Sequence, residues 1–291
     1  MKDILCKYLA LNNQVRVYTV TTKKVVNDYL KNVACSPVST AAIGRLMSGT
    51  LLMGATLKGD EKIFVSIDGD GPIGSLKAEA DAIGHVRGFV KNPLCDVSLN
   101  EFNHLDVAKA VGRGTLTVQK QLNMKEPFTG RGEVISGEIA EDLSYYYGIS
   151  EQTPTIIGLG VLVDVDYQVK VAGGFMIQVL PDADEATFQY LENLLTKIKS
   201  VTDLISNASD SDKVIDSLFG DYTFLESYPV EFRCVCSKEY SKQFIKNLKL
   251  SELDEIINQE GKLEITCNFC QKKYHFDKEE LLKIRKEMEN K

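Results

Sequence analysis

The chain has 291 residues, of which 44% are hydrophobic and 26% are charged, so it can bury a core and is not disordered over most of its length. At roughly 100–200 residues per domain, this length indicates two domains. The net charge of −7 argues against sequence-independent nucleic-acid binding, which depends on basic side chains that neutralise phosphates. We therefore expect no nucleic-acid partner.

The first 180 residues are predicted to form one α+β domain. Residues 14–22 alternate apolar and polar side chains as a half-buried strand does, residues 22–34 show helical spacing, and a helix of small and apolar residues follows at 39–57. The later elements are strand-like runs at Lys62–Ile67, Leu76–Ala80, His85–Val90, Gly114–Gln119 and Gly132–Ser136, a short helix at Glu138–Tyr147, and apolar strands at Thr155–Val165 and Gln168–Leu180. Because strands dominate, the expected fold is a mainly antiparallel sheet with packed helices.

Two segments bear on cellular location. Residues 37–57 carry a single charge, Arg45, but they also contain three glycines and several hydroxyl residues, so a buried helix is predicted rather than a membrane span. Residues 1–9 lack the apolar run and the cleavage site of a signal peptide. We expect a cytoplasmic protein with no membrane partner, whose cysteines are metal ligands or redox groups rather than structural disulfides.

Residues 181–231 are predicted to be an amphipathic helical linker. Apolar residues recur at intervals of three and four from Ala183 to Ser206, which predicts one amphipathic helix or two in series. Residues 207–211 interrupt this pattern, and Asp212–Phe219 then forms a shorter helix closed by Gly220 as a C-cap. The apolar face of the longer helix has to pack against another part of the protein.

Residues 232–291 form a small unit with its own cysteine pattern. One residue separates Cys234 from Cys236, two separate Cys267 from Cys270, and 30 residues lie between the pairs. Four thiolates at this spacing complete a tetrahedral zinc site with no open coordination position, which is typical of structural rather than catalytic zinc. The sequence therefore predicts one Zn²⁺ held by these four cysteines. The unit's 13 Lys and Arg mostly alternate with its 11 Asp and Glu, as on a solvated helix face.

A zinc site of this kind decides whether the small unit folds. About 60 residues barely supply a sufficient core, whereas structural zinc contributes roughly 10–16 kcal/mol of binding coupled to folding. A disulfide formed within either cysteine pair closes only a short loop and restores little of that stabilisation. Oxidation with loss of zinc is expected to unfold the unit. The residues alone leave open whether the unit is a passive module or a redox switch.

A glycine motif at Gly69–Gly74 matches the G-x-G-x-x-G pattern of dinucleotide sites. Asp70 adds a negative charge to this loop, and residues 75–80 alternate like a strand instead of opening a helix. A hairpin turn is therefore predicted.

The remaining histidines and cysteines form no catalytic constellation. His85 and His104 have no motif around them. His275, five residues after Cys270, could compete as a metal ligand, but it is expected on the surface of the strand at residues 274–276. The scattered thiols are interpreted as small buried hydrophobic residues; they are Cys6, Cys35 and Cys95. With no nucleotide-binding or triad motif, we expect no catalytic residues, no ATP-driven function and no enzyme activity.

The order of these segments resembles the heat-shock protein 33 family of redox-regulated holdase chaperones, over essentially the whole chain. The segments that carry the resemblance are Ala41–Leu46, Leu57–Asp60, Gly71–Gly74, Ser150–Pro154 and Ala172–Gln178, followed by the four cysteines at 234, 236, 267 and 270. The cysteine pattern placed after Gly173-Gly174-Phe175 is highly specific. Where the family often has Leu-Pro-Gly, this chain has Leu180-Pro181-Asp182, which should only alter a turn.

The resemblance implies a division into three parts, namely a chaperone core at 1–180, the linker at 181–231 and a zinc-binding redox-switch domain at 232–291. It implies that the four cysteines hold zinc in the reduced, inactive state and that oxidation pairs Cys234 with Cys236 and Cys267 with Cys270 as zinc leaves. The linker then loses structure and holds unfolding client proteins without ATP. The resemblance also implies a homodimer when oxidised and transfer of clients to ATP-dependent foldases.

Two alternatives belong to other functional classes. A constitutive zinc module could recruit a protein or RNA partner, but no clustered basic and aromatic surface accompanies the cysteine pairs. A thiol-disulfide oxidoreductase would place its cysteine pair at a helix start with one thiol of low pKa, whereas Cys267 follows the strand-like residues 263–266. The redox-regulated holdase is the leading hypothesis.

Overall fold

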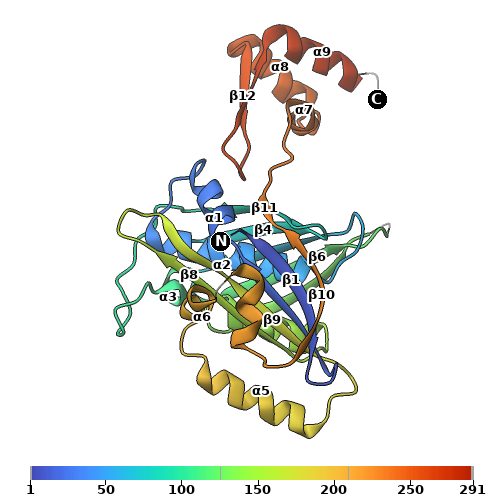
Figure 1. Cartoon of the computed structure of the whole chain (residues 1–291). Helices are drawn as coiled ribbons and strands as arrows, with labels where there is room; N and C mark the ends of the chain where they lie inside the picture. Colours follow the sequence, from blue (N-terminus) through green and yellow to red (C-terminus); the bar gives the residue numbers. More distant parts are fainter. Residues whose placement is uncertain (1, 125, 209, 290–291) are drawn as a thin grey trace. The chain divides into compact units, whose positions relative to one another are not determined.

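The structure is a computed structural model that describes residues 2–124, 126–208 and 210–289 (Figure 1). It separates into two compact units, Met1–Arg233 and Cys234–Lys291. Among the described residues, the strands of each sheet pair antiparallel, except for one short parallel pair in the first unit. The predicted α+β class with mainly antiparallel sheets is confirmed.

One sheet of the first unit joins strands from both ends of that unit. Its order is β10–β1–β2–β9–β8, and its strands are β1 (Ile4–Ala10), β2 (Val15–Thr21), β8 (Thr155–Val163), β9 (Val169–Val179) and β10 (Tyr222–Pro229). In β9, Gly173 has a φ of +150°, and a Cβ there would lie 2.1 Å from the carbonyl oxygen of Val20. Glycine is therefore what allows β2 and β9 to pair at this point.

The other sheet of the first unit has the order β11–β5–β4–β3–β6–β7. Its strands are β3 (Lys62–Gly69), β4 (Ser75–Asp81), β5 (His85–Val90), β6 (Gly114–Gln121), β7 (Phe128–Val134) and β11 (Glu231–Phe232), and β11 pairs parallel with β5. The glycine motif between β3 and β4 forms the turn of an antiparallel hairpin, which confirms that prediction. The expected strand at Gly132–Ser136 was wrong in its bounds, because β7 already ends at Val134.

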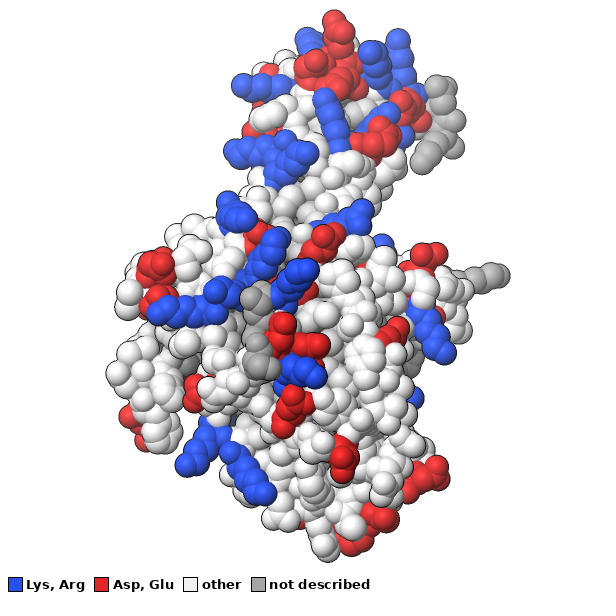
Figure 2. Space-filling view, in the orientation of Figure 1, with Lys and Arg blue, Asp and Glu red and all other residues white. Residues whose placement is uncertain are grey.

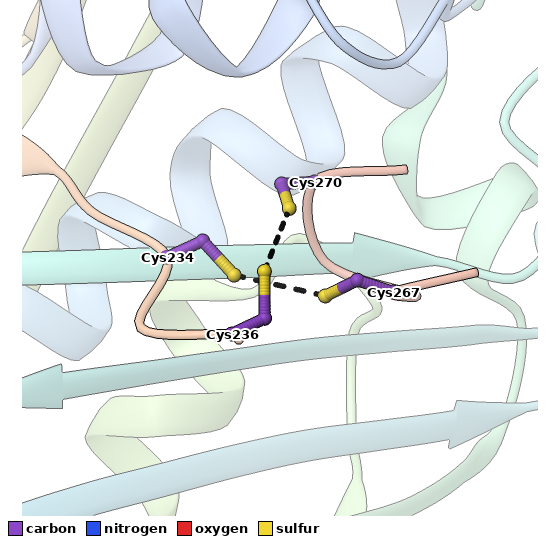
Figure 3. A group of neighbouring side chains, drawn as sticks. All are labelled: Cys234, Cys236, Cys267 and Cys270. Atoms are coloured by element: carbon purple, nitrogen blue, oxygen red, sulfur yellow. Dashed lines mark hydrogen bonds between the residues drawn. The ribbon is translucent and has the colours of Figure 1, made fainter. Parts of the chain in front are cut away.

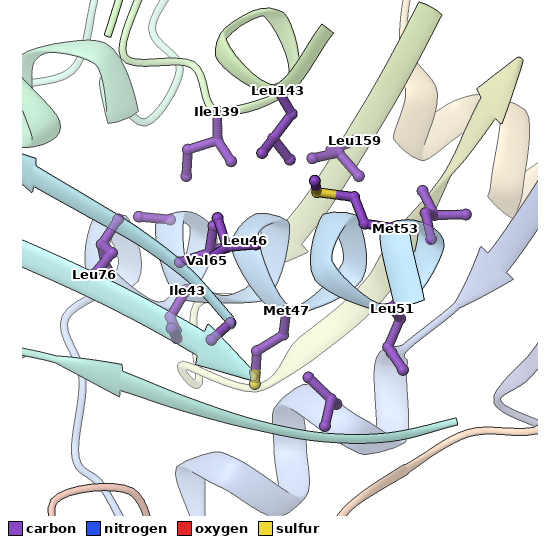
Figure 4. Close-up of a cluster of buried hydrophobic side chains, with 14 of the residues drawn as sticks. Ile43, Leu46, Met47, Leu51, Met53, Val65, Leu76, Ile139, Leu143 and Leu159 are labelled. Atoms are coloured by element: carbon purple, nitrogen blue, oxygen red, sulfur yellow. The ribbon is translucent and has the colours of Figure 1, made fainter. Parts of the chain in front are cut away.

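Helix α2 (Pro37–Gly54) lies at the centre of the first unit and contacts strands of both sheets. The helices α1 (Lys23–Leu30), α3 (Val107–Val111) and α4 (Ala140–Ser150) pack beside it. Figure 4 shows Met47 and Leu51 of α2 among the surrounding core side chains. Gly49 makes room for Leu143, whose Cδ1 would lie 2.6 Å from a Cβ at this glycine. The predicted buried helix is thus confirmed, and none of the described helices has the length and apolarity needed to cross a bilayer.

The segment after Pro181 covers the face of the five-stranded sheet that points away from α2. Tyr18 belongs to the core around α2, whereas its neighbour Val17 belongs to a second apolar cluster, because alternate strand residues face opposite sides. This second cluster also takes apolar residues from α5 (Glu185–Lys197), α6 (Val201–Asn207) and the 3₁₀ helix η1 (Ser211–Ser217). The Ala183–Ser206 pattern therefore forms two helices in series, and the helix expected at Asp212–Phe219 is a shorter 3₁₀ helix that ends before Gly220.

The second unit combines a hairpin with helices around a small core. Its elements are α7 (Lys238–Ile245), α8 (Leu250–Gln259), β12 (Lys262–Thr266), β13 (Lys273–Asp277) and α9 (Lys278–Glu289). The buried core consists of Ile245, Leu253, Ile257, Tyr274, Phe276, Leu281 and Ile284. Figure 2 shows basic and acidic side chains interspersed on this unit, and Lys242 and Lys246 both pair with Glu287. This agrees with the solvated helix face predicted from the alternating charges.

Candidate metal centre

Four cysteine side chains of the second unit point toward one another (Figure 3). Cys234 and Cys236 lie just before α7, and Cys267 and Cys270 lie in the turn between β12 and β13. The four Sγ atoms all lie within 4.8 Å of one another. The structure therefore brings together the four thiols that the sequence analysis predicted as ligands.

Local backbone geometry positions each cysteine pair. The turn of the β12–β13 hairpin begins at Cys267. The Cys267 N–H donates to the Lys272 carbonyl at 2.9 Å, and the Cys267 carbonyl accepts the Gln271 N–H at 2.8 Å. Gln271 adopts a left-handed conformation, with a φ of +57°, which closes this turn. In the other cysteine segment, the Ser237 side chain caps α7 by accepting the Tyr240 N–H at 3.0 Å. Cys236 therefore directly precedes an ordered helix start.

The spacing of the sulfurs fits a tetrahedral zinc ion. With zinc–sulfur bonds of about 2.3 Å, neighbouring sulfurs of such a site lie about 3.8 Å apart. The Cys234 and Cys267 sulfurs are 3.7 Å apart, and those of Cys236 and Cys270 are 3.3 Å apart. A donor set of four thiols selects a soft or borderline ion such as zinc over magnesium or calcium. The residues present therefore fit the ion, and with four protein ligands they complete its coordination shell.

The thiols differ in acidity because their surroundings differ. Burial raises the pKa of the Cys234 and Cys270 thiols. The pKa of Cys236 is lowered despite partial burial, chiefly because the Tyr274 hydroxyl donates a hydrogen bond to its sulfur at 3.1 Å. Packing four thiols together opposes the ionisation of all of them at once, and a bound cation offsets that repulsion.

His275 is not part of the sulfur cluster. It lies on β13 between the buried residues Tyr274 and Phe276, and its side chain is 72% exposed. Its Nδ1 lies 3.3 Å from a carboxylate oxygen of Glu264 on the neighbouring strand. The prediction of a surface histidine is confirmed.

The other three cysteines lie in the first unit. Cys6 is fully buried in the second apolar cluster, and Cys35 and Cys95 are partly buried against the core around α2. Burial raises the pKa of the Cys35 thiol to about 12, and the Cys95 sulfur lies 3.2 Å from the Ser39 hydroxyl oxygen. The prediction of a small buried hydrophobic residue is confirmed for Cys6, whereas Cys35 and Cys95 are only partly buried.

Sequence reasoning missed Tyr274 as a neighbour of the sulfurs. The strand pattern of residues 274–276 was recognised, but nothing in that pattern says which sulfur the hydroxyl reaches. The contact joins residues 38 positions apart, and it depends on how the hairpin packs beside the segment before α7.

Comparison with known proteins agrees with the geometry. The family model described as "Hsp33 protein" matches residues 3–277. The 33 kDa chaperonin of Bacillus pumilus is 43% identical over 288 residues, covering 98% of this chain and 99% of that protein, and the 33 kDa chaperonin of Enterococcus faecalis is 41% identical over 290 residues, covering 99% and 97%. The crystal structure of the 33 kDa chaperonin (heat shock protein 33 homolog) of Thermotoga maritima superposes with a TM-score of 0.92 at 33% identity, covering 100% of both chains. The chain therefore belongs to the Hsp33 family of chaperones.

Proposed function

We propose that this protein is a redox-regulated, ATP-independent holdase that is inactive when reduced and zinc-bound. Cys234, Cys236, Cys267 and Cys270 hold one Zn²⁺, which when bound keeps the four sulfurs as thiolates and ties the two cysteine segments together. The observation that carries the proposal is the gathering of these sulfurs within 4.8 Å in a unit with so small a core. Membership of the Hsp33 family supports it.

Oxidation is proposed to form the Cys234–Cys236 and Cys267–Cys270 disulfides, which the family resemblance implies. In each pair one thiolate attacks a peroxide oxygen and the O–O bond breaks, leaving a sulfenic acid and hydroxide. The second thiolate attacks that sulfur, so the S–S bond forms and a second hydroxide leaves. With protons from solvent, each disulfide converts one hydrogen peroxide into two waters. All four sulfurs lie within 4.8 Å, so this pairing needs only small side-chain movements.

The linker supplies the apolar surface for client proteins in this proposal. Its buried residues Leu191, Leu194 and Ile205 pack on the five-stranded sheet, and detachment of α5 and α6 exposes both these side chains and the sheet face beneath them. Two further apolar side chains of α5, Phe188 and Leu195, are already 39% and 42% exposed. The chain runs from this segment through β10 and β11 directly into Cys234, so the linker and the metal centre are adjacent in sequence.

The proposed partners are unfolding proteins, a second copy of the chain when oxidised, and ATP-dependent foldases that receive released clients. The proposal contains no catalytic step on a substrate. We place the protein in the cytoplasm because a reducing compartment keeps four closely spaced thiols free of disulfides until an oxidant appears.

Peroxide treatment is expected to switch the protein from inactive to active. Light scattering from a thermally unfolding client should fall when oxidised, zinc-free protein is added, and it should be unaffected by the reduced, zinc-loaded protein. A variant with Cys6, Cys35 and Cys95 replaced by Ser keeps the four cluster thiols and should switch in the same way. Equal suppression by both forms would remove redox control from the proposal. No suppression by either form, with zinc bound, would favour the constitutive zinc module.

Replacing Gln14 should loosen the linker without touching the metal centre. The Gln14 side chain accepts the Asp184 N–H at 2.9 Å and the Thr187 hydroxyl at 2.6 Å, and so holds the start of α5 to the β1–β2 turn. Gln14→Ala is expected to weaken this docking by about 1–2 kcal/mol. Amide hydrogen exchange should then accelerate in α5, and reduced protein should show some holdase activity. Gln189→Ala, which removes an exposed amide from the same helix, is the matched control. Unchanged exchange across Glu185–Lys197 would contradict this role of Gln14.

A further inference from the structure

Tyr274 connects the two cysteine segments of the metal centre through one hydrogen bond. It lies on β13 opposite Ile265, just after the Cys267–Cys270 turn, yet its hydroxyl donates to the sulfur of Cys236 in the other segment at 3.1 Å. Tyr274 is 7% exposed and belongs to the core of the second unit, against which Cys236 packs. The hydroxyl is therefore held at this sulfur by a buried ring on a paired strand.

This hydrogen bond makes the four sulfurs inequivalent. Among the described residues, Cys236 is the cluster cysteine to which a side-chain hydroxyl donates. The Lys272 ammonium lies 5.5 Å from the centroid of the Tyr274 ring, which favours a polarised O–H. A zinc ion with four thiolates carries a net charge of about −2, so an O–H donor stabilises the negative charge on the sulfur that it reaches. That stabilisation also makes the lone pairs of the sulfur less available for attack on an electrophile.

We propose that Tyr274 is a positioning residue that lowers the nucleophilicity of Cys236 and so slows oxidation of the reduced metal centre. The inference rests on the proposed function, because the oxidation it slows is the activating step. In that step the Cys236 thiolate attacks a peroxide oxygen, hydroxide leaves, and the Cys234 thiolate displaces the second hydroxide from the sulfenic acid. The Tyr274 hydroxyl stabilises the thiolate before attack more than the sulfenic acid after it, and this raises the barrier.

Site-resolved alkylation of the reduced, zinc-loaded protein tests the inference. Tyr274→Phe removes the hydroxyl and keeps the ring in the core. After timed N-ethylmaleimide treatment and mass spectrometry of peptides, labelling of Cys236 is expected to be about threefold to tenfold faster than in the unchanged protein, relative to Cys234, Cys267 and Cys270. Peroxide-driven zinc loss, followed with a colorimetric chelator, should accelerate as well. Tyr240→Phe, which removes an exposed hydroxyl from α7 of the same unit, should change neither rate.

The readout separates an effect of the hydroxyl from a loss of structure. If Tyr274 were only structural, Tyr274→Phe would accelerate labelling of all four cysteines together, and that result would overturn the proposal, as would an unchanged Cys236 rate. If Tyr274→Phe fails to hold zinc, a fluorinated tyrosine at position 274 gives the opposite test. Its more acidic hydroxyl should slow Cys236 labelling, and no slowing would contradict the inference.

Failure of the proposed function can be distinguished from failure of this inference. Alkylation of the zinc-loaded protein requires neither disulfide formation nor client binding. A selective Cys236 effect without peroxide-induced holdase activity would support the role of Tyr274 and remove the redox switch. Peroxide-induced holdase activity without a selective Cys236 effect would support the redox switch and contradict the role of Tyr274.

Discussion

Removal of zinc from the reduced protein by a strong chelator is expected to unfold the second unit and to leave the first unit folded. The second unit has a core of few buried side chains, and roughly 10–16 kcal/mol of zinc binding is coupled to folding in small domains of this kind. A domain of about 60 residues has only a few kcal/mol of net stability without such a ligand. The hairpin turn and the segment before α7, which the four sulfurs tie together, then separate.

Hydrogen exchange with mass spectrometry measures this result directly. Amides of α8 and α9 should lose protection when zinc is removed, whereas those of α2 and β3 should keep it. Cys267→Ser should show the unprotected pattern without chelator, and Cys95→Ser, which changes a thiol of the first unit, should behave like the unchanged protein. Protection of α8 and α9 that persists in zinc-free, reduced protein would show that the small core is sufficient by itself.

Asp142→Ala is expected to destabilise the first unit by about 3–5 kcal/mol, because four backbone N–H groups of one turn donate to this buried carboxylate. Its Oδ1 accepts the N–H groups of Ile135 at 2.8 Å, Ser136 at 2.9 Å and Gly137 at 3.3 Å, and its Oδ2 accepts that of Ile139 at 2.9 Å. The side chain is fully buried, so water cannot readily replace these acceptors. Ile139, a β-branched residue, is held at a φ of +73°, and loss of the carboxylate removes what keeps it there.

Urea denaturation, followed by tyrosine fluorescence or circular dichroism, measures the loss in free energy of unfolding caused by Asp142→Ala. Glu141→Ala is the matched control, since it removes an exposed carboxylate from the same first turn of α4. Asp142→Asn keeps the shape and one acceptor oxygen and should fall between the two. A loss of less than about 1 kcal/mol in Asp142→Ala would mean that the turn reorganises around other acceptors.

Elements with a clear periodic pattern were predictable, and those without one were not. The small-residue run at 39–57 indicated a buried helix because glycines lower its hydropathy and permit close packing, and α2 has this environment. Strand β1 was missed because apolar residues occupy successive positions and contribute to both apolar clusters, so they do not alternate cleanly with polar ones. Strand β10 was missed because its residues are largely exposed, and its pairing with β1 comes from tertiary structure.

The amino-acid sequence by itself determined which atoms are available for the metal centre. Thiol spacing within Cys234–Cys236 and Cys267–Cys270 is local, since one or two intervening residues are enough to place two sulfurs on one ion. The amphipathic pattern of 183–206 is local in the same sense, because a helix sets the spacing of its own apolar face.

Only the tertiary structure decided which groups surround these atoms. The contact of the Tyr274 hydroxyl with Cys236 and the attachment of α5 to Gln14 each join residues that are far apart in the sequence. Such contacts depend on strand register and on the angles between elements, which arise from the whole core and leave no periodic signal in the chain. The sequence therefore identifies the four thiols, whereas the fold determines how each thiol is buried and hydrogen-bonded.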